Sequence, residues 1–294
     1  MSIPTPEPAW QTAARELIGL GLREDLGSAG DVTTAALIPA DQMAQVKIVA
    51  RSAGVLCGLP VARMVFDELD PAVRFDERAR DGDALAAGQV VAHLSGKLQS
   101  LLIGERTCLN FLTHLSGVAT LTRRFVDAVA GTRAGIYDTR KTLPGWRALE
   151  KLAVAAGGGK NHRMGLYDMV LIKDNHLAGW REGGGTKIAG AVRAARERSP
   201  QGLPIEVEVD TLEQLADALE GQPDIVLLDN MTVDDLRRAV AVRDERAPGV
   251  KLEASGGVTL ASVARIAQTG VERISAGALT HSPPALDLAF DWET

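Results

Sequence analysis

The sequence predicts an α/β protein with a (β/α) barrel in its second half and a smaller sheet before it. From residue 135 onward, short apolar segments alternate with helical segments, which is the pattern of parallel strands joined by crossover helices. No GxGxxG motif follows the first of these strands, and this disfavours a dinucleotide-binding doubly wound sheet. In residues 45–95, short alternating or β-branched segments are separated by glycine and aspartate, which is typical of a small sheet.

The predicted elements follow one another in a simple order. A proline-rich start, which does not resemble a secretory signal, leads into a helix expected at residues 10–22. A long helical region follows the small sheet from residue 98 to about residue 130, with Gly117 as a candidate break. The barrel strands are expected at GIYD (135–138), MVLI (169–172), IEVEV (205–209), DIVLL (224–228), KLEA (251–254) and ERISA (272–276), with helices between them at 186–199, 211–221, 232–247 and 259–270.

The composition is that of a globular chain with a net acidic surface. Of 294 residues, 46% are hydrophobic, and 38 Asp and Glu against 32 Lys and Arg give a formal net charge of −6. This balance disfavours a general nucleic-acid or anionic-membrane surface, so any anion site is expected to be local. The apolar runs are far shorter than the roughly 20 residues of a membrane span. Cys57 and Cys108 lack CxxC spacing, which favours reduced, buried thiols in a cytoplasmic protein.

Polar side chains follow nearly all of the predicted barrel strands. Because active sites of (β/α) barrels lie at the carboxyl ends of the strands, these residues are the first candidates for a site. They are Thr139, Arg140, Lys141, Lys173, Glu208, Asp229, Ser255, Gly256, Gly257 and Gly277. Between residues 137 and 176, seven Lys and Arg stand against four Asp and Glu. This local excess of positive charge, in a chain of net charge −6, predicts an anionic ligand.

Two kinds of ligand fit these side chains. The glycines of the turn 255–257 precede a predicted helix and let backbone N–H groups approach a phosphate. Glu208 and Asp229 are carboxylates of the kind that hold Mg²⁺ or sugar hydroxyls beside a phosphate. Arginine side chains suit planar carboxylates, which they bind through paired hydrogen bonds. The sequence therefore indicates a phosphorylated, metal-associated sugar and a flat molecule with several carboxylates.

Each of these features also has a structural explanation, as a helix cap, an ordinary turn, a structural histidine or a solvated charge. Such explanations apply to Asp229, Asn230, His176, Lys173 and the turn 255–257. Lys160, which follows three glycines, is as compatible with solvent as with a ligand. The convergence of six strand ends on one mouth favours a functional site over these alternatives.

Seven segments, between about residues 21 and 282, carry a family resemblance, and DTRKT, GGGKNHR and LIKDNH occur among them in order and at close spacing. They are EDLGSAGDVTT, GERTCLNFLTHLSGVATLT, DTRKTLPGWRALEKLAVAAGGGKNHRMGLYDMVLIKDNH, EVEVDTLEQL, IVLLDNM, LEASGGV and ERISAGALTHS. In these segments the chain resembles the quinolinate phosphoribosyltransferases. The resemblance implies an α/β sandwich-like N-terminal domain at 1–117, joined by the C-terminal segment 279–294, and an incomplete (β/α) barrel at 118–278. It also implies a reaction in which quinolinate and phosphoribosyl pyrophosphate, with Mg²⁺, give nicotinate mononucleotide, pyrophosphate and carbon dioxide.

The resemblance implies a role for each matching residue. A pocket for the pyridine dicarboxylate would be lined by Arg106, Arg140, His162, Arg163 and Lys173. The catalytic residues Lys141, Glu208 and Asp229 would face phosphoribosyl pyrophosphate, with Glu208 and Asp229 also holding the metal. Ser255, Gly256 and Gly277 would hold the 5′-phosphate, and the other substrate-binding residues would be Thr139, Gly257 and Ala276. The family implies a homodimer or hexamer in which Arg106 reaches into the neighbouring subunit's site.

Three alternative functions stay open at this point. A phosphoribosyltransferase acting on nicotinate would need less positive charge than this set supplies. A Schiff-base aldolase would use Lys173 as its nucleophile. A non-catalytic paralogue would be expected to lose part of the charged set. Residues 178–186 depart from the family pattern as a small insertion, which we expect to be a passive loop rather than a lid.

Overall fold

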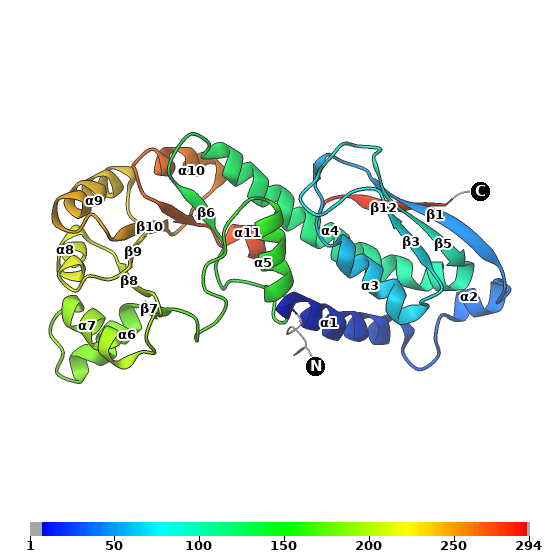
Figure 1. Ribbon diagram of the computed structural model, residues 1–294, viewed down its shortest axis with the longest axis horizontal. Helices are drawn as coiled ribbons and strands as arrows, with labels where there is room; N and C mark the ends of the chain where they lie inside the picture. The colour runs from blue at the N-terminus through cyan, green and yellow to red at the C-terminus, as the bar shows by residue number, and fades with distance from the viewer. Residues whose placement is uncertain (1–7, 293–294) are drawn as a thin grey trace, which may run out of the picture. The chain divides into compact units, whose positions relative to one another are not determined.

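The computed structural model describes residues 8–292, so that most of the proline-rich start lies outside the described residues. The chain forms two compact units (Figure 1). Unit 1 consists of residues 1–123, 142–158 and 280–294, and unit 2 consists of residues 124–141 and 159–279. The predicted domain limits, at 117/118 and 278/279, differ slightly from this division and stay a prediction. Within residues 8–292, no helix is long and apolar enough to span a membrane.

Unit 1 contains an antiparallel sheet in the order β12-β1-β5-β3, formed by β1 (Met43–Ala50), β3 (Arg74–Glu77), β5 (Val90–Lys97) and β12 (Leu288–Trp292). In Figure 1, helix α3 (Leu59–Leu69) lies along one side of this sheet. The Phe66 ring of α3 lies 6.2 Å from the Phe75 ring of β3 and 6.4 Å from the Phe290 ring of β12. The remaining elements are α1 (Ala9–Leu26), α2 (Val32–Leu37), α5 (Arg147–Ala156) and the pair β2 (Gly54–Val55) and β4 (Ala84–Leu85). Helix on sheet is the sandwich-like arrangement that the family resemblance implied.

The long helix α4 (Leu98–Ala128) runs without interruption, so the predicted break at Gly117 is wrong. The glycine has a packing reason instead. A Cβ atom at this position would lie 2.3 Å from the carbonyl oxygen of Pro284. The C-terminal segment therefore approaches the helix backbone so closely that only glycine fits there.

Unit 2 is built on six parallel strands in the order β6-β11-β10-β9-β8-β7. They are β6 (Gly135–Tyr137), β7 (Val170–Ile172), β8 (Ile205–Val209), β9 (Ile225–Asp229), β10 (Lys251–Ser255) and β11 (Arg273–Ser275). The helices are α6 (Asp174–Glu182), α7 (Ile188–Arg198), α8 (Leu212–Glu220), α9 (Val233–Arg246), α10 (Leu260–Ala267) and α11 (Ala278–His281), the last ending in unit 1. Figure 1 shows α7 to α10 on the outer side of the strands. Since β6 and β7 are both edge strands, the barrel is open, as predicted.

The segment 178–186 is more ordered than a loop insertion. Residues up to Glu182 continue helix α6, and only Gly183–Thr186 form the connection to α7. A Cβ atom on Gly185 would lie 2.1 Å from Nε1 of Trp180, so the connection packs against the indole. The prediction of a loop over this whole range is therefore wrong, while the choice between lid and passive segment stays a prediction.

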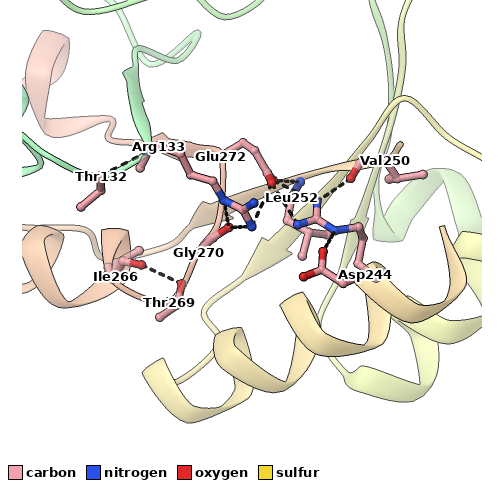
Figure 2. Close-up of polar contacts among 11 residues, drawn as sticks. Thr132, Arg133, Asp244, Val250, Leu252, Ile266, Thr269, Gly270 and Glu272 are labelled. Atoms are coloured by element: carbon pink, nitrogen blue, oxygen red, sulfur yellow. Dashed lines mark hydrogen bonds and ion pairs between the residues drawn. The ribbon is translucent and has the colours of Figure 1, made fainter. Parts of the chain in front are cut away.

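A polar network joins α9, β10 and the start of β11 at the end of the sheet where these strands begin (Figure 2). The buried Arg243 side chain donates to both Glu272 carboxylate oxygens, at 2.9 and 3.0 Å, and to the carbonyl of Val250 at 2.6 Å. Glu272 also accepts the N–H of Leu252 at 3.0 Å. Burial opposes the charge on Glu272, but the Arg243 hydrogen bonds outweigh it and hold the pKa of this carboxyl below its usual value.

Candidate functional site

The inward face of the unit 2 strands is polar where the strands end. Side chains alternate along a strand, so residues two apart share one face. Glu208 follows Glu206 on β8 in this way, Asp229 follows Leu227 on β9, and Ser255 follows Glu253 on β10. The parallel register sets Asp229 beside Ser255 and Glu208 beside Leu227. One face of the sheet thus carries carboxylates and a hydroxyl to the same mouth.

A cavity of about 380 Å³ opens at this mouth, entirely within unit 2. Nine of its lining residues were predicted from the sequence: Thr139, Arg140, Lys141, His162, Arg163, Lys173, Glu208, Asp229 and Ser255. Four were not predicted: Leu171, Leu227, Glu253 and Ser275. The volume suits a ligand of the size of a pyridine dicarboxylate or a phosphorylated sugar. We call this cavity the pocket.

The other predicted phosphate-site residues lie next to the pocket in sequence without lining it. Gly256 and Gly257 continue directly from Ser255 with φ of +90° and +58°, and Ala276 and Gly277 follow Ser275. Positive φ at two consecutive residues is the conformation for which this turn needs glycine.

Arg106 lies apart from these residues, in unit 1. It stands on α4 and lines a separate cavity of about 360 Å³, together with Asp31 and Ile103. The division of the chain therefore places the predicted dicarboxylate-binding arginine and the pocket in different units.

His162 and Arg163 are held by the end of the first barrel strand. The fully buried Asp138 carboxylate accepts the N–H of His162 at 2.8 Å, and Nδ1 of His162 accepts the N–H of Arg163 at 2.8 Å. The Arg163 side chain donates from Nη1 to the carbonyl of Met169 at 3.2 Å. Burial and the neighbouring Arg140 guanidinium lower the pKa of Arg163, which indicates two cations gathered on one wall.

The opposite charge lies across the same pocket. Lys173 forms an ion pair with the Glu208 carboxylate, and Asn230 donates from its side-chain amide to Asp229 at 2.7 Å. The cap of helix α9 is Thr232, whose hydroxyl accepts the N–H of Asp235, so Asp229 is not needed as a helix cap. The pocket combines a cationic wall with three carboxylates, those of Glu208, Asp229 and the buried Glu253.

For two residues, His176 and Lys160, the structure supports a role outside ligand binding. Nδ1 of His176 accepts the N–H of Lys173 at 2.9 Å at the start of α6, which is a structural role. Lys160 is exposed and its Nζ lies 5.8 Å from the centre of the Tyr137 ring. A Cβ atom on Gly135 would lie 3.3 Å from this Nζ, so the lysine points toward the beginning of β6 and away from the pocket.

The sequence interpretation missed a buried set of charges under the pocket. Glu206 and Glu253 are fully buried on β8 and β10, and Arg273 is almost fully buried on β11. No clear signal marked them, because IEVEV, KLEA and ERISA carry other polar residues and the pattern does not reveal which charged side chain faces the interior.

A larger cavity of about 860 Å³ opens at the other end of the strands. It is lined by the connections that precede β8, β9 and β10, including Pro204 and Asp224, and by strand residues such as Lys251. We assign the functional site to the smaller pocket because barrel active sites lie at the carboxyl ends of the strands. The paired charges of the larger cavity, such as Arg196 with Asp224, are exposed ion pairs.

An open α/β barrel whose strand ends gather both cations and carboxylates defines a class of protein, the barrel enzymes that act on multiply charged anions. Comparison with known families identifies the member of that class. Residues 31–116 match the N-terminal domain, and residues 118–291 the C-terminal domain, of quinolinate phosphoribosyl transferase. The chain belongs to the quinolinate phosphoribosyltransferase family.

Relatives match over nearly their whole length. The nicotinate-nucleotide pyrophosphorylase (carboxylating) of Mycobacterium leprae is 47% identical over 281 residues, which cover 95% of this chain and 97% of the relative. A probable enzyme of the same name from Bacillus subtilis is 41% identical over 277 residues, covering 94% and 92%. The solved structure of nicotinate-nucleotide pyrophosphorylase from Francisella tularensis has a TM-score of 0.88 and 34% identity, and the match covers 100% of this chain and 99% of that one.

Proposed function

We propose that the pocket transfers the phosphoribosyl group of phosphoribosyl pyrophosphate to quinolinate and decarboxylates the product. The products are nicotinate mononucleotide, pyrophosphate and carbon dioxide, and the reaction belongs to NAD biosynthesis. Family membership supports this assignment. The observation that carries it is the distribution of charge in one pocket, with Arg140, Lys141 and Arg163 near the first barrel strand and Glu208 and Asp229 on β8 and β9.

The residues act by binding and orientation. Arg140 and Arg163 present guanidinium groups that pair with the two carboxylates of quinolinate. This fixes the ring nitrogen behind the anomeric carbon, where a new C–N bond forms as the bond to pyrophosphate oxygen breaks. Lys141 is placed to stabilise the departing pyrophosphate. Positive charge that develops on the sugar is stabilised by Glu208 and Asp229.

The second step needs no side chain as a nucleophile. Once the ring nitrogen is glycosylated and cationic, the carboxylate beside it leaves as carbon dioxide, and its bonding electrons pass to the ring. A proton then takes the vacated carbon. We propose that no covalent protein intermediate forms, and a kinetically competent ribosylated or acylated enzyme would contradict this.

Mg²⁺ is part of the proposal. Glu208 and Asp229 offer carboxylate oxygens to the same pocket, and each also has a neighbouring donor, Lys173 or Asn230. This set fits an ion that takes few protein ligands and otherwise binds waters and substrate phosphates. When bound, Mg²⁺ would neutralise charge on the pyrophosphate.

A homodimer or hexamer is the proposed assembly, with Arg106 acting in the pocket of another subunit. Family membership supports this assembly, and Arg106 stands on α4 outside the residues that line the pocket. Mixing an inactive Arg106→Ala variant with an inactive Lys141→Ala variant should restore activity, because mixed assemblies then contain one intact site. The proposed location is the cytoplasm, which the two free, buried cysteines support.

Two other functions receive less support. A nicotinate phosphoribosyltransferase would leave part of the cationic wall without a carboxylate. A Schiff-base aldolase would need Lys173 as a neutral amine, whereas this side chain is in an ion pair with Glu208.

Product analysis tests all three functions. The purified protein is mixed with phosphoribosyl pyrophosphate and Mg²⁺, with quinolinate or nicotinate in parallel, and products are separated by chromatography. Nicotinate mononucleotide from quinolinate alone is the expected result, and product from nicotinate alone would overturn it. Borohydride reduction in the presence of substrate should leave no mass adduct on Lys173.

A further inference from the structure

A chain of buried charges lies beneath the pocket in unit 2, formed by His162, Glu206, Glu253 and Arg273. Nε2 of His162 lies 2.9 Å from a Glu206 oxygen and 3.5 Å from a Glu253 oxygen. The other Glu253 oxygen accepts a hydrogen bond from Nε of Arg273. The Arg273 guanidinium in turn lies 3.7 Å from the centre of the Tyr137 ring. We call these four charged residues the buried cluster.

Burial makes the members of this cluster depend on one another. Both carboxylates are fully buried, and the His162 side chain is only 7% exposed. Arg273 offsets one of the two negative charges, which leaves the N–H of His162 to face the other. Burial opposes a charge on the imidazole, but Glu206 and Glu253 outweigh it and raise the pKa of His162.

The other edge of the imidazole connects the buried cluster to the pocket wall. Nδ1 of His162 accepts the N–H of Arg163, so the ring proton is assigned to Nε2, the atom that faces the carboxylates. Both ring nitrogens therefore have protein partners. The orientation of the ring determines where the backbone of Arg163 is held, and hence where its guanidinium begins.

We propose that Glu253 is a positioning residue that acts through His162 to hold Arg163 at the wall of the pocket. The substrate in this inference rests on the proposed function, since Arg163 is expected to bind a quinolinate carboxylate. Without the Glu253 carboxylate, Nε2 has one carboxylate partner fewer and the ring is less firmly oriented. A shift of about 1 Å in a binding group is enough to weaken productive binding strongly. Binding of the pyridine substrate should therefore weaken more than binding of phosphoribosyl pyrophosphate.

A metal ion is the competing explanation for these side chains. Ligand atoms of His162, Glu206 and Glu253 lie within 4.8 Å of one another, which a metal ion would accept. Arg273 already contributes a positive charge at Glu253, and a second cation beside it is disfavoured by repulsion. We therefore argue for positioning, and the experiment below includes metal binding as an outcome.

The Glu253→Gln variant tests the inference by steady-state kinetics, because it replaces the carboxylate by an amide of the same size. We expect KM for quinolinate to rise about fivefold or more, and KM for phosphoribosyl pyrophosphate to stay within about twofold. In a His162→Ala background, Glu253→Gln should not change KM for quinolinate further, because the His162 ring through which Glu253 acts is absent. If the two substitutions raise KM for quinolinate independently, so that their factors multiply in the double variant, the inference is overturned.

Glu272→Gln is the matched control. It makes the same substitution at a carboxylate that pairs with an arginine, Arg243 of helix α9. Glu272 is next to Arg273 in sequence but does not line the pocket. The control variant should lower stability and leave both KM values unchanged. An equal rise in the quinolinate KM in this variant would show general loosening and would overturn the role assigned to Glu253.

Nitrogen NMR of the His162 ring gives a readout that does not depend on activity. The wild-type protein should show the Nε2–H form, and Glu253→Gln, or Glu253→Asp if the first variant does not fold, should shift these signals. Unchanged signals would overturn the inference whatever the substrate is. Shifted signals in a protein inactive on quinolinate would overturn only the proposed function. A stoichiometric transition metal in the purified protein that is lost in Glu253→Gln would replace positioning by metal binding.

Discussion

Gly256 and Gly257 are neighbours in one turn, yet different constraints act on them. Both have positive φ, which costs an L-residue about 1–2 kcal/mol. A Cβ atom on Gly256 would also lie 2.2 Å from the side-chain oxygen of Asn230 and 2.8 Å from its backbone nitrogen, whereas a Cβ atom on Gly257 would have nothing within 4 Å. Gly256 is needed for conformation and for space, and Gly257 for conformation alone.

Alanine substitutions at Gly256 and Gly257 should separate the requirement for space from the requirement for positive φ. Gly256→Ala must displace the Asn230 backbone beside Asp229, so we expect KM for phosphoribosyl pyrophosphate to rise about tenfold or more, equal to about 1.4 kcal/mol. Gly257→Ala should have a clearly smaller effect. Steady-state kinetics with the sugar substrate varied measures both, and equal effects would contradict the steric argument.

Arg163→Lys should weaken the dicarboxylate pocket at nearly constant charge. The lysine ammonium cannot reproduce the planar guanidinium that contacts the Met169 carbonyl and pairs with a carboxylate. Loss of one charged hydrogen bond is worth about 1.5–3 kcal/mol, so KM for quinolinate should rise by at least about tenfold. Lys160→Arg is the control, because that exposed side chain points away from the pocket. A normal KM in Arg163→Lys would remove Arg163 from the binding residues.

At the scale of elements, the Arg243–Glu272 network joins a helix to two neighbouring strands. Arg243 is 2% exposed, and it pairs with Asp244 as well as with Glu272, so removal of the Glu272 charge leaves a buried guanidinium with one of these two acidic partners. The network also satisfies backbone groups at the start of β10, including the N–H of Leu252. It holds together the end of the sheet opposite the pocket.

Glu272→Gln should therefore destabilise the protein by about 1.5–3 kcal/mol at neutral pH, because the hydrogen bonds to the Arg243 guanidinium lose the carboxylate charge. Because the folded-state pKa of Glu272 is lowered, its contribution to stability is present above the ordinary value of 4.5 and is lost as the pH falls through the folded-state pKa. The difference in unfolding free energy between the wild type and the variant should thus shrink in acid. Urea unfolding at pH 7 and below pH 4.5 measures this difference, and a constant value would contradict the assigned pKa direction.

At the scale of the whole molecule, the two units are interleaved along the chain. The chain passes between them four times, at 123/124, 141/142, 158/159 and 279/280. Helix α4 continues through the first of these points without a break. Partial unfolding of one unit would therefore disturb segments of the other.

We expect one cooperative unfolding transition. Cys57 and Cys108 are fully buried in unit 1, and burial, with Asp81 as a further cause at Cys57, raises the pKa of both thiols, so neither should react with a thiol reagent until unit 1 opens. Trp180 is the tryptophan of unit 2, and comparison with Trp180→Phe isolates its fluorescence. Thiol exposure and Trp180 fluorescence should change at the same urea concentration, and separate midpoints would show independently unfolding units.

The predicted site was most accurate at strand ends. Seven of the nine predicted lining residues stand at strand ends, and they share the pocket because the carboxyl ends of parallel strands meet at one edge. His162 and Arg163 were predicted from the family resemblance instead. Glu253 was overlooked because a glutamate in KLEA does not reveal whether it faces solvent or the interior. Gly117 was misread for a related reason, since its neighbour Pro284 is distant in sequence.

The sequence by itself determined the six barrel strands, the polar mouth, the excess of cations on one wall and the family, because these depend on periodicity and on local motifs. Only the tertiary structure decided which charges compensate one another under the pocket, why helix α4 carries a glycine, and that Lys160 points away from the site. The physical reason is that a buried charge or a close backbone approach is defined by its partner, and these partners lie on separate strands or at the far end of the chain.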